Sequence, residues 1–480
     1  MEYDAIIGLE VHVQLKTKSK AFSRSRCVFG DEHNTATDPL TLGLPGALPV
    51  LNFGAIRQTV RAGAIFGCTI AKSCRWDRKN YFYPDNPKNY QITQQHEPLC
   101  IGGAVEIELP GEARNIQGIH RKVRLNRIHL EEDCGKLSHL GTLSLVDFNR
   151  AGVPLAEIVS EPDMHSAEEA SAYLNSIRMH LSGAEVSDCD MEKGQMRCDV
   201  NVSLKPAGSA VLGERVEYKN LNSISGVRNA IVHEIARQRN ILQSGGTIGR
   251  ETRRWDAQRN TSDGLRAKEN VHDYCYFPEP DIPPLKLDDE TIESLCEGLP
   301  ERPFDRQRRF MEHYELPYTV ASVLCPQRQL ADFFEAAAGT CKNYRAIANF
   351  IANDILRETS KTGEEIGLRI GADELAQLVN AIDEGRIGKQ AAQNAIASTY
   401  STGTSFREFL NSTTKEIAQE TGATMEEICR RAIGASPKAV AEFRGGKETA
   451  INAIKGAAMR ESKGKADPSV LDRILRELLR

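Results

Sequence analysis

Four short segments of this chain alternate between apolar and polar side chains. The longest, residues 7–15, reads Ile-Gly-Leu-Glu-Val-His-Val-Gln-Leu, and the others lie near residues 127–131, 197–203 and 215–219. Successive side chains of a β-strand point to opposite faces, so each segment is predicted to be a strand with one apolar and one polar face. A plain antiparallel sheet with one solvated face would show the same alternation.

The periodicity changes once along the chain, and a candidate hinge follows later. Up to about residue 294, alternating segments with Gly and Pro predict strands and loops with a few helices. Apolar residues then recur at i, i+3 and i+4, as in Leu330, Phe333 and Phe334, which is typical of packed helices. Residues 402–405, Thr-Gly-Thr-Ser, are a candidate hinge into a last small helical unit. The predicted domains are therefore 1–294, 295–405 and 406–480.

Composition narrows the class of protein. The 480 residues are 40% hydrophobic and 26% charged, proportions typical of a globular chain rather than a disordered one. The net charge of −5, from 61 basic and 66 acidic residues, excludes a nucleic-acid-coating protein that is basic throughout. Residues 430–480 differ, with 12 basic and 6 acidic residues, so an acidic body is joined to a basic tail.

Cysteine usage and hydropathy indicate a compartment. The 12 cysteines are scattered without any C-x-x-C spacing, and we expect them to be reduced thiols. No apolar run approaches the ~20 residues that span a bilayer, and the acidic first residues do not resemble the start of a secretory signal. We therefore expect a cytoplasmic protein with no membrane partner.

The polar faces of the four alternating segments mix carboxylates with Arg, Lys and His. If the strands are neighbours, five side chains converge on one concave surface: Glu10, His12, Glu131, Asp199 and Glu217. Several oxygen ligands and few nitrogens suit Mg²⁺, which keeps water ligands and recruits substrate phosphates. The cations Arg197, Arg215 and Lys219 would then hold phosphate oxygens. The pattern predicts a magnesium–phosphate site for phosphoryl transfer.

A second cluster combines cations with aromatic side chains. Its members are Arg253, Arg254, Trp255, Arg259, Arg266 and Lys268, followed by Tyr274, Tyr276 and Phe277. Arg binds phosphate through two nitrogens and aromatic rings stack on bases, although a salt-bridged surface loop would have the same composition. The P-loop, the Rossmann glycine fingerprint and the G-x-S-x-G elbow are all missing from the sequence.

Several long runs resemble those of a known family. They are residues 8–15 (GLEVHVQL), 42–52 (LGLPGALPVLN), 78–85 (RKNYFYPD), 129–133 (HLEED), 147–154 (DFNRAGVP), 197–203 (RCDVNVS) and 219–223 (KNLNS). Their order and identity resemble the B subunits of the aspartyl/glutamyl-tRNA amidotransferases over essentially the full length. The stretch at 463–468 (KGKADP) also resembles the C-terminal domain of that family.

The resemblance implies an α+β fold with an N-terminal cradle domain on an antiparallel sheet, then a helical domain and a small all-helical tail. It implies that the cradle uses ATP and Mg²⁺ to phosphorylate the side-chain carboxylate of Glu or Asp on a misacylated tRNA, and that ammonia then displaces the phosphate. The chain has no amidase-like Gly-Gly-Ser-Ser stretch. By the same resemblance, a separate glutaminase of the amidase family supplies the ammonia, and a small third protein holds the two together in a heterotrimer.

Residue roles are carried over only where motif positions match. The catalytic candidates are Glu10, Glu131, Asp199 and Lys219. The candidates for binding ATP are Arg197, Asn201, Arg215 and Glu251. The metal candidates are His12, Glu131 and Glu217, with His12 atypical for Mg²⁺ and therefore able to act through a water.

One departure from the family concerns zinc. Many members have Cys-x-Cys and then Cys-x-x-Cys before the LGLPG run, where this chain has Ser23, Ser25, Asp38 and Thr41, with Cys27 alone nearby. A closed structural zinc site needs four such ligands. We therefore expect no zinc, with residues 22–41 held by packing alone, and stoichiometric zinc in the purified protein would contradict this.

Two other functions remain open at this point. The chain could be a scaffold that only holds tRNA, or a two-metal nuclease or phosphatase, because clustered carboxylates serve those enzymes as well. A nuclease would cleave tRNA without ATP. Under each of these functions the basic tail is expected to contact the tRNA backbone, unless it is a plain solvated bundle.

Overall fold

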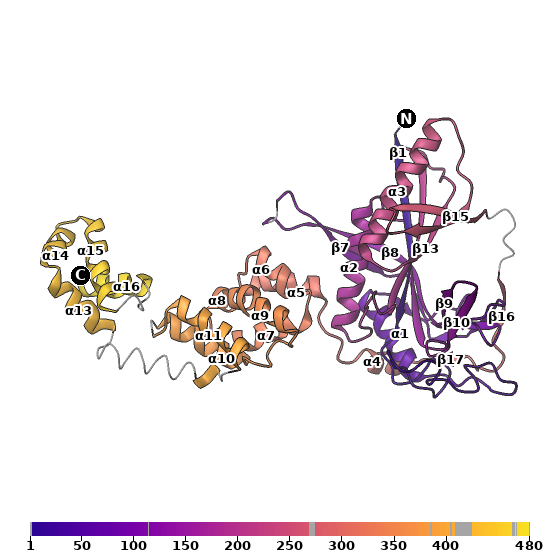
Figure 1. Ribbon diagram of the computed structural model, residues 1–480, viewed down its shortest axis with the longest axis horizontal. Helices are drawn as coiled ribbons and strands as arrows, with labels where there is room; N and C mark the ends of the chain where they lie inside the picture. The colour runs from indigo at the N-terminus through magenta and orange to yellow at the C-terminus, as the bar shows by residue number, and fades with distance from the viewer. Residues whose placement is uncertain are drawn as a thin grey trace. The chain divides into compact units, whose positions relative to one another are not determined.

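The computed structural model describes residues 2–113, 115–267, 274–384, 386–403, 406–408, 425–462, 466 and 468–479. It divides into two compact units, Met1–Arg302 and Pro303–Arg480 (Figure 1). A large sheet dominates the first unit and helices make up the second, so the predicted α+β class is confirmed. The further boundary near residue 405 stays a prediction, and the expected hinge falls partly outside the described residues, as does most of the stretch 463–468.

A ten-stranded sheet forms the first unit, in the order β15-β14-β13-β12-β1-β11-β8-β6-β2, with β7 paired to β8. Its strands are β1 (Tyr3–Gln14), β2 (Thr69–Ile70), β6 (Cys100–Ile101), β7 (Ala104–Leu109), β8 (Ile119–Glu132), β11 (Pro154–Ser160), β12 (Met196–Pro206), β13 (Val216–Leu221), β14 (Glu251–Asp256) and β15 (Thr261–Ala267). The pairings are antiparallel except that of β13 with β14, which is parallel. Between these two strands the chain returns through helix α3 (Ile224–Gln243), as a parallel pair requires.

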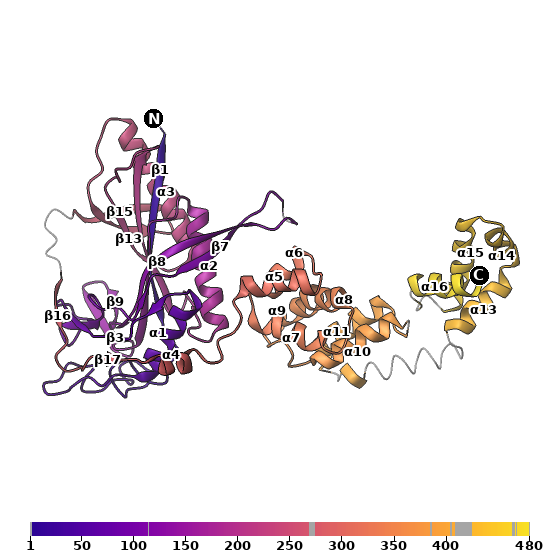
Figure 2. The ribbon, with the colours of Figure 1, turned by 180° about the vertical axis from the view of Figure 1, so that it is seen from behind.

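Helices cover the apolar face of the sheet. They are α1 (Phe53–Ile65), α2 (Ala167–Gly183) and α3, and Figure 1 and Figure 2 show α2 and α3 lying along the strands. The alternation predicted for β1 is observed, because Leu9, Val11 and Val13 are buried in the core while Glu10 and His12 on the other face are half-buried. Side-chain caps fix the starts of the helices, as where Ser223 accepts a hydrogen bond from Gly226 N at 3.0 Å.

Among its described residues, the first unit also contains three smaller sheets and one further helix. They are β16 (Cys275–Pro278), β4 (Asp77–Asn80) and β5 (Tyr90–Thr93) in one sheet, β9 (Lys136–Leu140) with β10 (Leu143–Asp147), β17 (Leu285–Lys286) with β3 (Ser73–Cys74), and α4 (Asp289–Cys296). Strand β5 packs on β8 of the large sheet. The three-stranded sheet therefore stands beside the large one, close to the end of β8.

Polar contacts hold the segment of residues 22–41, so the expectation that packing alone holds it is wrong. Lys20 Nζ donates to Ala36 O at 2.7 Å, and Asn149 Nδ2 donates to Glu32 O at 2.7 Å. Two of the positions at which the resemblance suggested zinc ligands bond to each other here, since Thr41 N donates to Asp38 Oδ1 at 2.8 Å. The absence of zinc itself stays a prediction.

The described residues of the second unit form two apolar cores built by helices. The helices are α5 (Pro303–His313), α6 (Tyr318–Leu324), α7 (Arg328–Ala338), α8 (Tyr344–Asn349), a π-helix (Phe350–Ile355), α9 (Leu356–Thr362), α10 (Ala372–Asp383), α11 (Lys389–Thr402), α13 (Met425–Ala435), α14 (Pro437–Arg444), α15 (Ile451–Glu461) and α16 (Pro468–Leu479). Leu330, Phe333 and Phe334 are buried on α7, as their spacing predicts. One core lies among α5 to α11 and the other among α13 to α16. None of the described helices is long and apolar enough to cross a membrane.

Candidate active site

The polar face of the central strands forms one continuous surface. In the antiparallel register His12 of β1 lies opposite Arg197 of β12 and Glu157 of β11, and Glu157 lies opposite His129 of β8. Residues directly opposite each other in antiparallel strands point to the same face. Side chains far apart in the chain, such as His12 and Arg197, are thus neighbours on one surface, as the alternation predicts.

Two histidines and two glutamates meet on this surface, and we call them the histidine–carboxylate cluster: His12, His129, Glu131 and Glu157. His12 Nε2 lies 3.5 Å from Glu157 Oε2 and 3.9 Å from Glu131 Oε1. His129 Nε2 lies 3.4 Å from Glu157 Oε2 and 3.9 Å from Glu131 Oε2. One ligand atom from each of His12, Glu131 and Glu157 lies within 4.8 Å of the other two, so this group could hold a metal ion.

The two imidazoles of this cluster offset the negative charge of its two glutamates. Burial disfavours a charged imidazole, but the hydrogen bond to Glu157 and the charges of Glu157 and Glu131 outweigh burial and raise the pKa of His12 to about 9. Burial alone would raise the pKa of Glu157, yet the charges of His129 and His12 hold that pKa well below its usual range. The cluster therefore attracts positive charge, and a divalent cation could supply what the His12 imidazolium supplies here.

A second group, the lysine–carboxylate cluster, is formed by Glu10, Asp199, Asn201, Glu217 and Lys219. Lys219 Nζ lies 3.0 Å from Asp199 Oδ2 and 2.9 Å from Glu217 Oε1, while Asn201 Nδ2 donates to Glu10 Oε1 at 3.1 Å. Burial, together with the charges of Glu157 and Asp199, raises the pKa of Glu10. Burial opposes a charged lysine, but Asp199 and Glu217 more than offset it and raise the pKa of Lys219.

Arg197 connects this surface to Asp133. Its Nη2 lies 2.7 Å from Asp133 Oδ1, and Gln14 Nε2 donates to Asp133 Oδ2 at 3.0 Å. Asp133 is buried, which would raise its pKa, but Arg197 and then Arg150 lower that pKa below the usual range. The guanidinium predicted to bind phosphate is therefore fixed in place at the edge of the histidine–carboxylate cluster.

One predicted binding residue lies on the other face of the sheet. Glu251 is opposite Val216 in the parallel pair, and it lies 2.9 Å from Arg237 on α3, so it belongs to the helix-covered face. Its neighbour Thr252 faces the site instead, donating from Oγ1 to Glu217 Oε2 at 3.0 Å. Arg215 is exposed just before β13. The role predicted for Glu251 has no support from its position, and the role of Arg215 stays a prediction.

Two cations of the second sequence cluster are paired locally. Arg253 Nη1 lies 3.0 Å from Glu251 Oε1, and Arg259 pairs with both Asp256 and Asp263. This is the salt-bridged arrangement that the composition left open. Lys268 lies outside the described residues.

Sequence reasoning missed two contributors to the site. Glu157 is a half-buried carboxylate in the mostly apolar strand β11, which was the available signal. Lys79 lies on β4, and although burial opposes its charge, Glu131, Tyr276 and Glu157 raise its pKa. Its Nζ also lies 4.7 Å from the centre of the Tyr274 ring. Lys79 belongs to the run 78–85, but nothing in that run shows that β4 faces Glu131.

Comparison with known proteins decides the family. A model described as the GatB/GatE catalytic domain matches residues 5–293, and one described as the GatB domain matches residues 332–479. Three similar proteins, each named as the B subunit of an aspartyl/glutamyl-tRNA(Asn/Gln) amidotransferase, come from Opitutus terrae (52% identical), Methylacidiphilum infernorum (45%) and Thermoanaerobacter pseudethanolicus (44%). Each alignment covers 100% of this chain and at least 99% of the relative.

The chain belongs to this family of amidotransferase B subunits. The resemblance found in the sequence motifs is thereby confirmed. The match to the catalytic domain of the family spans both clusters, from Glu10 to Lys219, as well as Lys79 and Asp133.

Proposed function

We propose that this chain acts within a tRNA-dependent amidotransferase as its B subunit, converting Glu-tRNA(Gln) and/or Asp-tRNA(Asn) into Gln-tRNA(Gln) and Asn-tRNA(Asn). The names of its relatives describe this activity, and they align with the chain from end to end. The observation that carries the proposal is the pair of adjoining carboxylate clusters on one sheet face. A site of this kind can order phosphates and balance their charge.

The chemistry requires activation of a carboxylate. A side-chain carboxylate is a poor acyl donor at neutral pH, so we propose that its oxygen first attacks the γ-phosphorus of ATP, with ADP leaving. Ammonia then attacks the carbonyl carbon of the acyl phosphate, and inorganic phosphate leaves. Charge neutralisation and positioning provide most of the catalysis in phosphoryl transfer.

The residues present fit a divalent cation such as Mg²⁺. Glu131 and Glu157, with His12 directly or through a water, would hold it, and such an ion would neutralise phosphate oxygens when bound. Lys219 contributes a fixed positive charge beside Asp199 and Glu217. Lys79 presents its ammonium to Glu131 and Glu157 from the neighbouring sheet, where it can orient the incoming carboxylate of the substrate.

Partners are part of this proposal. The relatives are named as one subunit of their enzyme, which indicates an enzyme with several different chains. We propose that a glutaminase of the amidase family and a small third protein complete it, that the complex works in the cytoplasm, and that this chain alone does not hydrolyse glutamine. Release of ammonia from glutamine by the purified chain would contradict this division of labour.

The test uses the reconstituted complex with misacylated Glu-tRNA, Mg²⁺ and labelled ATP, without an ammonia source. We expect wild type to form ADP only when charged tRNA is present. Glu131→Ala and Glu157→Gln should lower that rate at least about 100-fold, because each removes a charge on which positioning of the phosphates depends. Glu168→Gln, which removes an exposed carboxylate on α2, is the matched control and should retain the rate.

The other functions predict different results. A two-metal nuclease would shorten the tRNA in the absence of ATP. A scaffold without chemistry would show the same ADP formation in wild type and in Glu131→Ala. The second result would place phosphorylation outside these clusters.

A further inference from the structure

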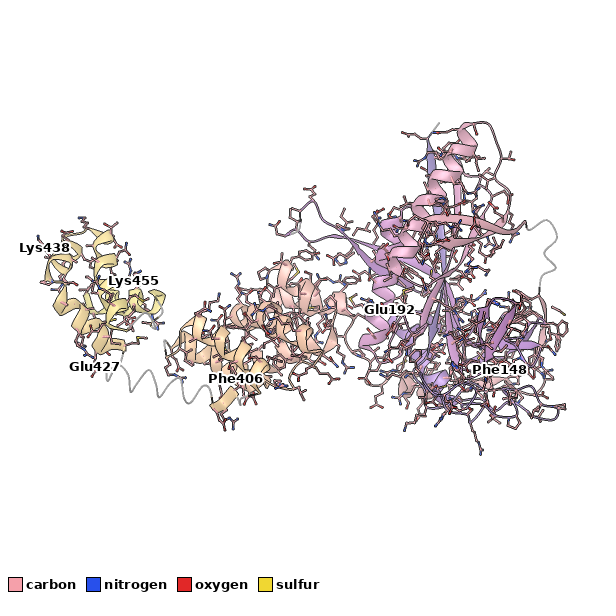
Figure 3. All side chains as sticks on the ribbon, in the orientation of Figure 1. Phe148, Glu192, Phe406, Glu427, Lys438 and Lys455 are labelled. Carbon is pink, nitrogen blue, oxygen red and sulfur yellow. The ribbon has the colours of Figure 1, made fainter. Side chains whose placement is uncertain are left out.

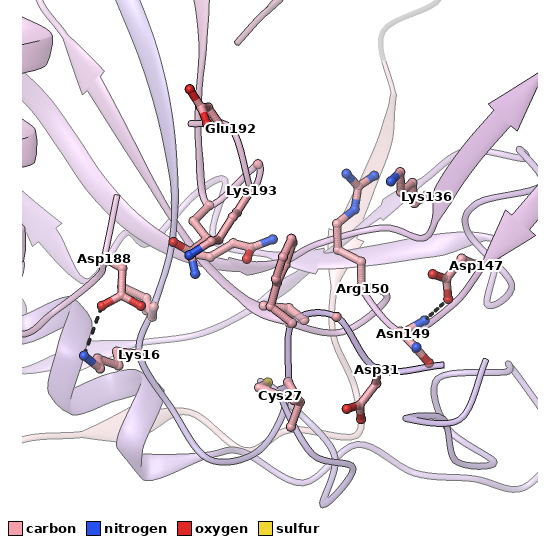
Figure 4. A pocket seen from close by; sticks show the side chains of 18 of the residues that line it. Lys16, Cys27, Asp31, Lys136, Asp147, Asn149, Arg150, Asp188, Glu192 and Lys193 are labelled. Carbon is pink, nitrogen blue, oxygen red and sulfur yellow. Dashed lines mark hydrogen bonds and ion pairs between the residues drawn. The ribbon is translucent and has the colours of Figure 1, made fainter. Parts of the chain in front are cut away.

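Two aromatic residues of the second sequence cluster lie next to Lys79. The Lys79 Nζ atom is 4.7 Å from the centre of the Tyr274 ring, and Tyr276 is directly opposite Lys79 where β16 pairs with β4. A pocket of about 680 Å³ opens where β1 ends (Figure 4), but neither tyrosine lines it. The role of these two rings must therefore follow from their contacts with Lys79.

The three-stranded sheet turns one face toward the histidine–carboxylate cluster. Thr93 of β5 lies on this face, because its Oγ1 donates to Glu131 Oε2 at 3.3 Å. Gln91, two residues earlier in the same strand, shares the face and is directly opposite Lys79 of β4. Since residues directly opposite each other in antiparallel strands point to the same side, Lys79 and Tyr276 face the cluster as well.

An aromatic ring, and not a carboxylate, is the close partner of the Lys79 ammonium. The distance from Nζ to the Tyr274 ring centre is within the range of a cation–π interaction. The described residues place no carboxylate oxygen within 4.0 Å of this nitrogen. Burial opposes the charge of Lys79, but Glu131 and the other acidic groups nearby raise its pKa, so the ammonium stays charged.

The kind of partner decides whether the charge remains available. Lys219 is paired with Asp199 and Glu217, which neutralise it. The face of an aromatic ring attracts a cation through its quadrupole but carries no net charge. Tyr274 therefore holds the Lys79 ammonium in place without neutralising it, and an anionic group of a substrate is the partner that this arrangement suits.

Two further tyrosines fix the ring of Tyr274. The ring centre of Tyr81 lies 5.8 Å away with the planes at 65°, and that of Tyr276 lies 6.4 Å away at 83°. Both are edge-to-face arrangements, which aromatic pairs favour. Tyr81 is anchored in turn, because its hydroxyl lies 2.6 Å from Cys134 Sγ. The ring that contacts Lys79 is thus held from two sides, although Tyr274 is 49% exposed.

We propose that Tyr274 is a positioning residue, which holds the Lys79 ammonium ready to pair with the side-chain carboxylate of the amino acid on the misacylated tRNA. The proposal rests on the proposed function, in which that carboxylate is the group to be activated. Pairing with Lys79 orients the attacking oxygen beside the histidine–carboxylate cluster. It also offsets the repulsion between the incoming carboxylate and the two glutamates of the cluster, Glu131 and Glu157.

The test measures kcat/KM of the reconstituted complex for Glu-tRNA(Gln), with Mg²⁺, ATP and ammonium chloride as the nitrogen donor. Tyr274→Phe keeps the ring and should retain kcat/KM. Tyr274→Leu should lower kcat/KM about ten-fold, as expected for the loss of one partly desolvated cation–π contact. Tyr3→Leu is the matched control, because Tyr3 is a half-buried tyrosine at the end of β1 far from His12, and it should retain kcat/KM.

Fluorinated phenylalanines at position 274 separate electrostatic attraction from packing. Each added fluorine weakens the negative face of the ring with little change in its shape. We therefore expect kcat/KM to fall stepwise from phenylalanine through its monofluoro, difluoro and trifluoro derivatives. Equal values along this series, or full activity of Tyr274→Leu, would overturn the assignment.

ATP binding shows which substrate group Lys79 meets. The affinity of the complex for ATP, measured by calorimetry without tRNA, should be the same in wild type and in Tyr274→Leu. A loss of ATP affinity parallel to the loss of kcat/KM would place Lys79 on a phosphate and would also overturn the assignment. If the wild-type complex consumes no ATP with Glu-tRNA(Gln), the proposed function itself fails, whatever the variants show.

Discussion

Lys20 is a charged residue in an apolar interior, and it joins three separate parts of the chain. Its side chain is fully buried, and its ammonium donates to Ala36 O at 2.7 Å and to Phe148 O at 3.4 Å. Burial lowers the pKa of Lys20 to about 8, although nearby charges such as Asp38 oppose this. The ammonium therefore helps to fix the segment of residues 22–41.

The pKa of Lys20 predicts how stability changes with pH. The unfolded chain keeps this lysine protonated up to about pH 10.4, whereas the folded chain releases the proton near pH 8. Between these values the unfolded state binds more protons, so the free energy of unfolding should rise with pH, by up to about 3 kcal/mol. Below pH 8 the lysine is charged in both the folded and the unfolded state, so it does not make the free energy of unfolding depend on pH.

Urea unfolding from pH 7 to pH 10 would measure this effect, with the fluorescence of Trp76 as the signal, because that ring is buried 6.3 Å from Phe22. The free energy of unfolding of wild type, relative to that of Lys20→Met, should increase as the pH rises. Lys18→Met, which alters an exposed lysine two residues earlier, should show no such change. Parallel pH curves for wild type and Lys20→Met would contradict the assignment.

At the scale of elements, the sequence predicts which side chains of a strand share a face better than it predicts how the strands pair. The alternation in β1 and β12 correctly groups Glu10 with His12 and Asp199 with Asn201, because the period of two is a property of the strand alone. The face of Glu251 depends on how β14 pairs with β13 after α3, and no local pattern contains that register.

Glu157 shows a second limit of what the sequence can predict. Strand β11 is buried on both sides of this residue, so its sequence, Pro-Leu-Ala-Glu-Ile-Val-Ser, lacks the alternation that marked the other strands. Only the position of β11 between β1 and β8 brings Glu157 between His12 and His129. The sequence therefore predicts which side chains of one strand share a face, but it does not predict which strands lie next to each other in the sheet.

Helix α1 lies so close to the edge of the sheet that a glycine is required. A Cβ at Gly63 would lie 2.5 Å from Cys100 Sγ and 2.9 Å from Ile70 Cδ1. Gly63→Val should therefore lower the free energy of unfolding by about 2 kcal/mol, as overpacking does. Urea unfolding with the Trp76 signal would measure the loss, and a variant as stable as wild type would show that the helix can move away.

Gly456→Ala is the control for helical glycines. This residue lies in α15 and has no atom within 4 Å of the position of an added Cβ. Alanine there should leave stability unchanged or raise it by about 0.5–1 kcal/mol, because alanine is the better helix former. The contrast separates crowding at Gly63 from helix propensity.

For the whole molecule, the contrast between an acidic body and a basic tail predicts that tRNA binds the tail. Removing the tail should weaken tRNA binding and flatten its salt dependence, since each lost phosphate contact lowers the slope of log K against log salt by about 0.9. The deletion should begin after Glu408, because Phe406, labelled in Figure 3, is buried in the core among α5 to α11. Unchanged tRNA affinity in filter-binding assays would exclude the tail as a contact.

A milder variant tests the same surface without deletion. Lys438, also labelled in Figure 3, and Arg444 are exposed on α14, the helix of the tail that has no buried residue. Lys438→Gln with Arg444→Gln should reduce the salt slope by up to about 2 if both contact phosphates. The same measurement on Lys122→Gln, in the first unit, is the control.

The position of β1 in the sheet has a consequence for synthesis in the cell. This strand comes first in the chain, but it pairs with β11 and with β12, which ends at Pro206. At about 5–20 residues per second, a ribosome takes roughly 10 to 40 seconds to produce the missing neighbours. During that time Leu9, Val11 and Val13 have no cover from the strands that flank them. A cell making this protein must protect the nascent strand for that interval, and slower translation would lengthen the period in which it can aggregate.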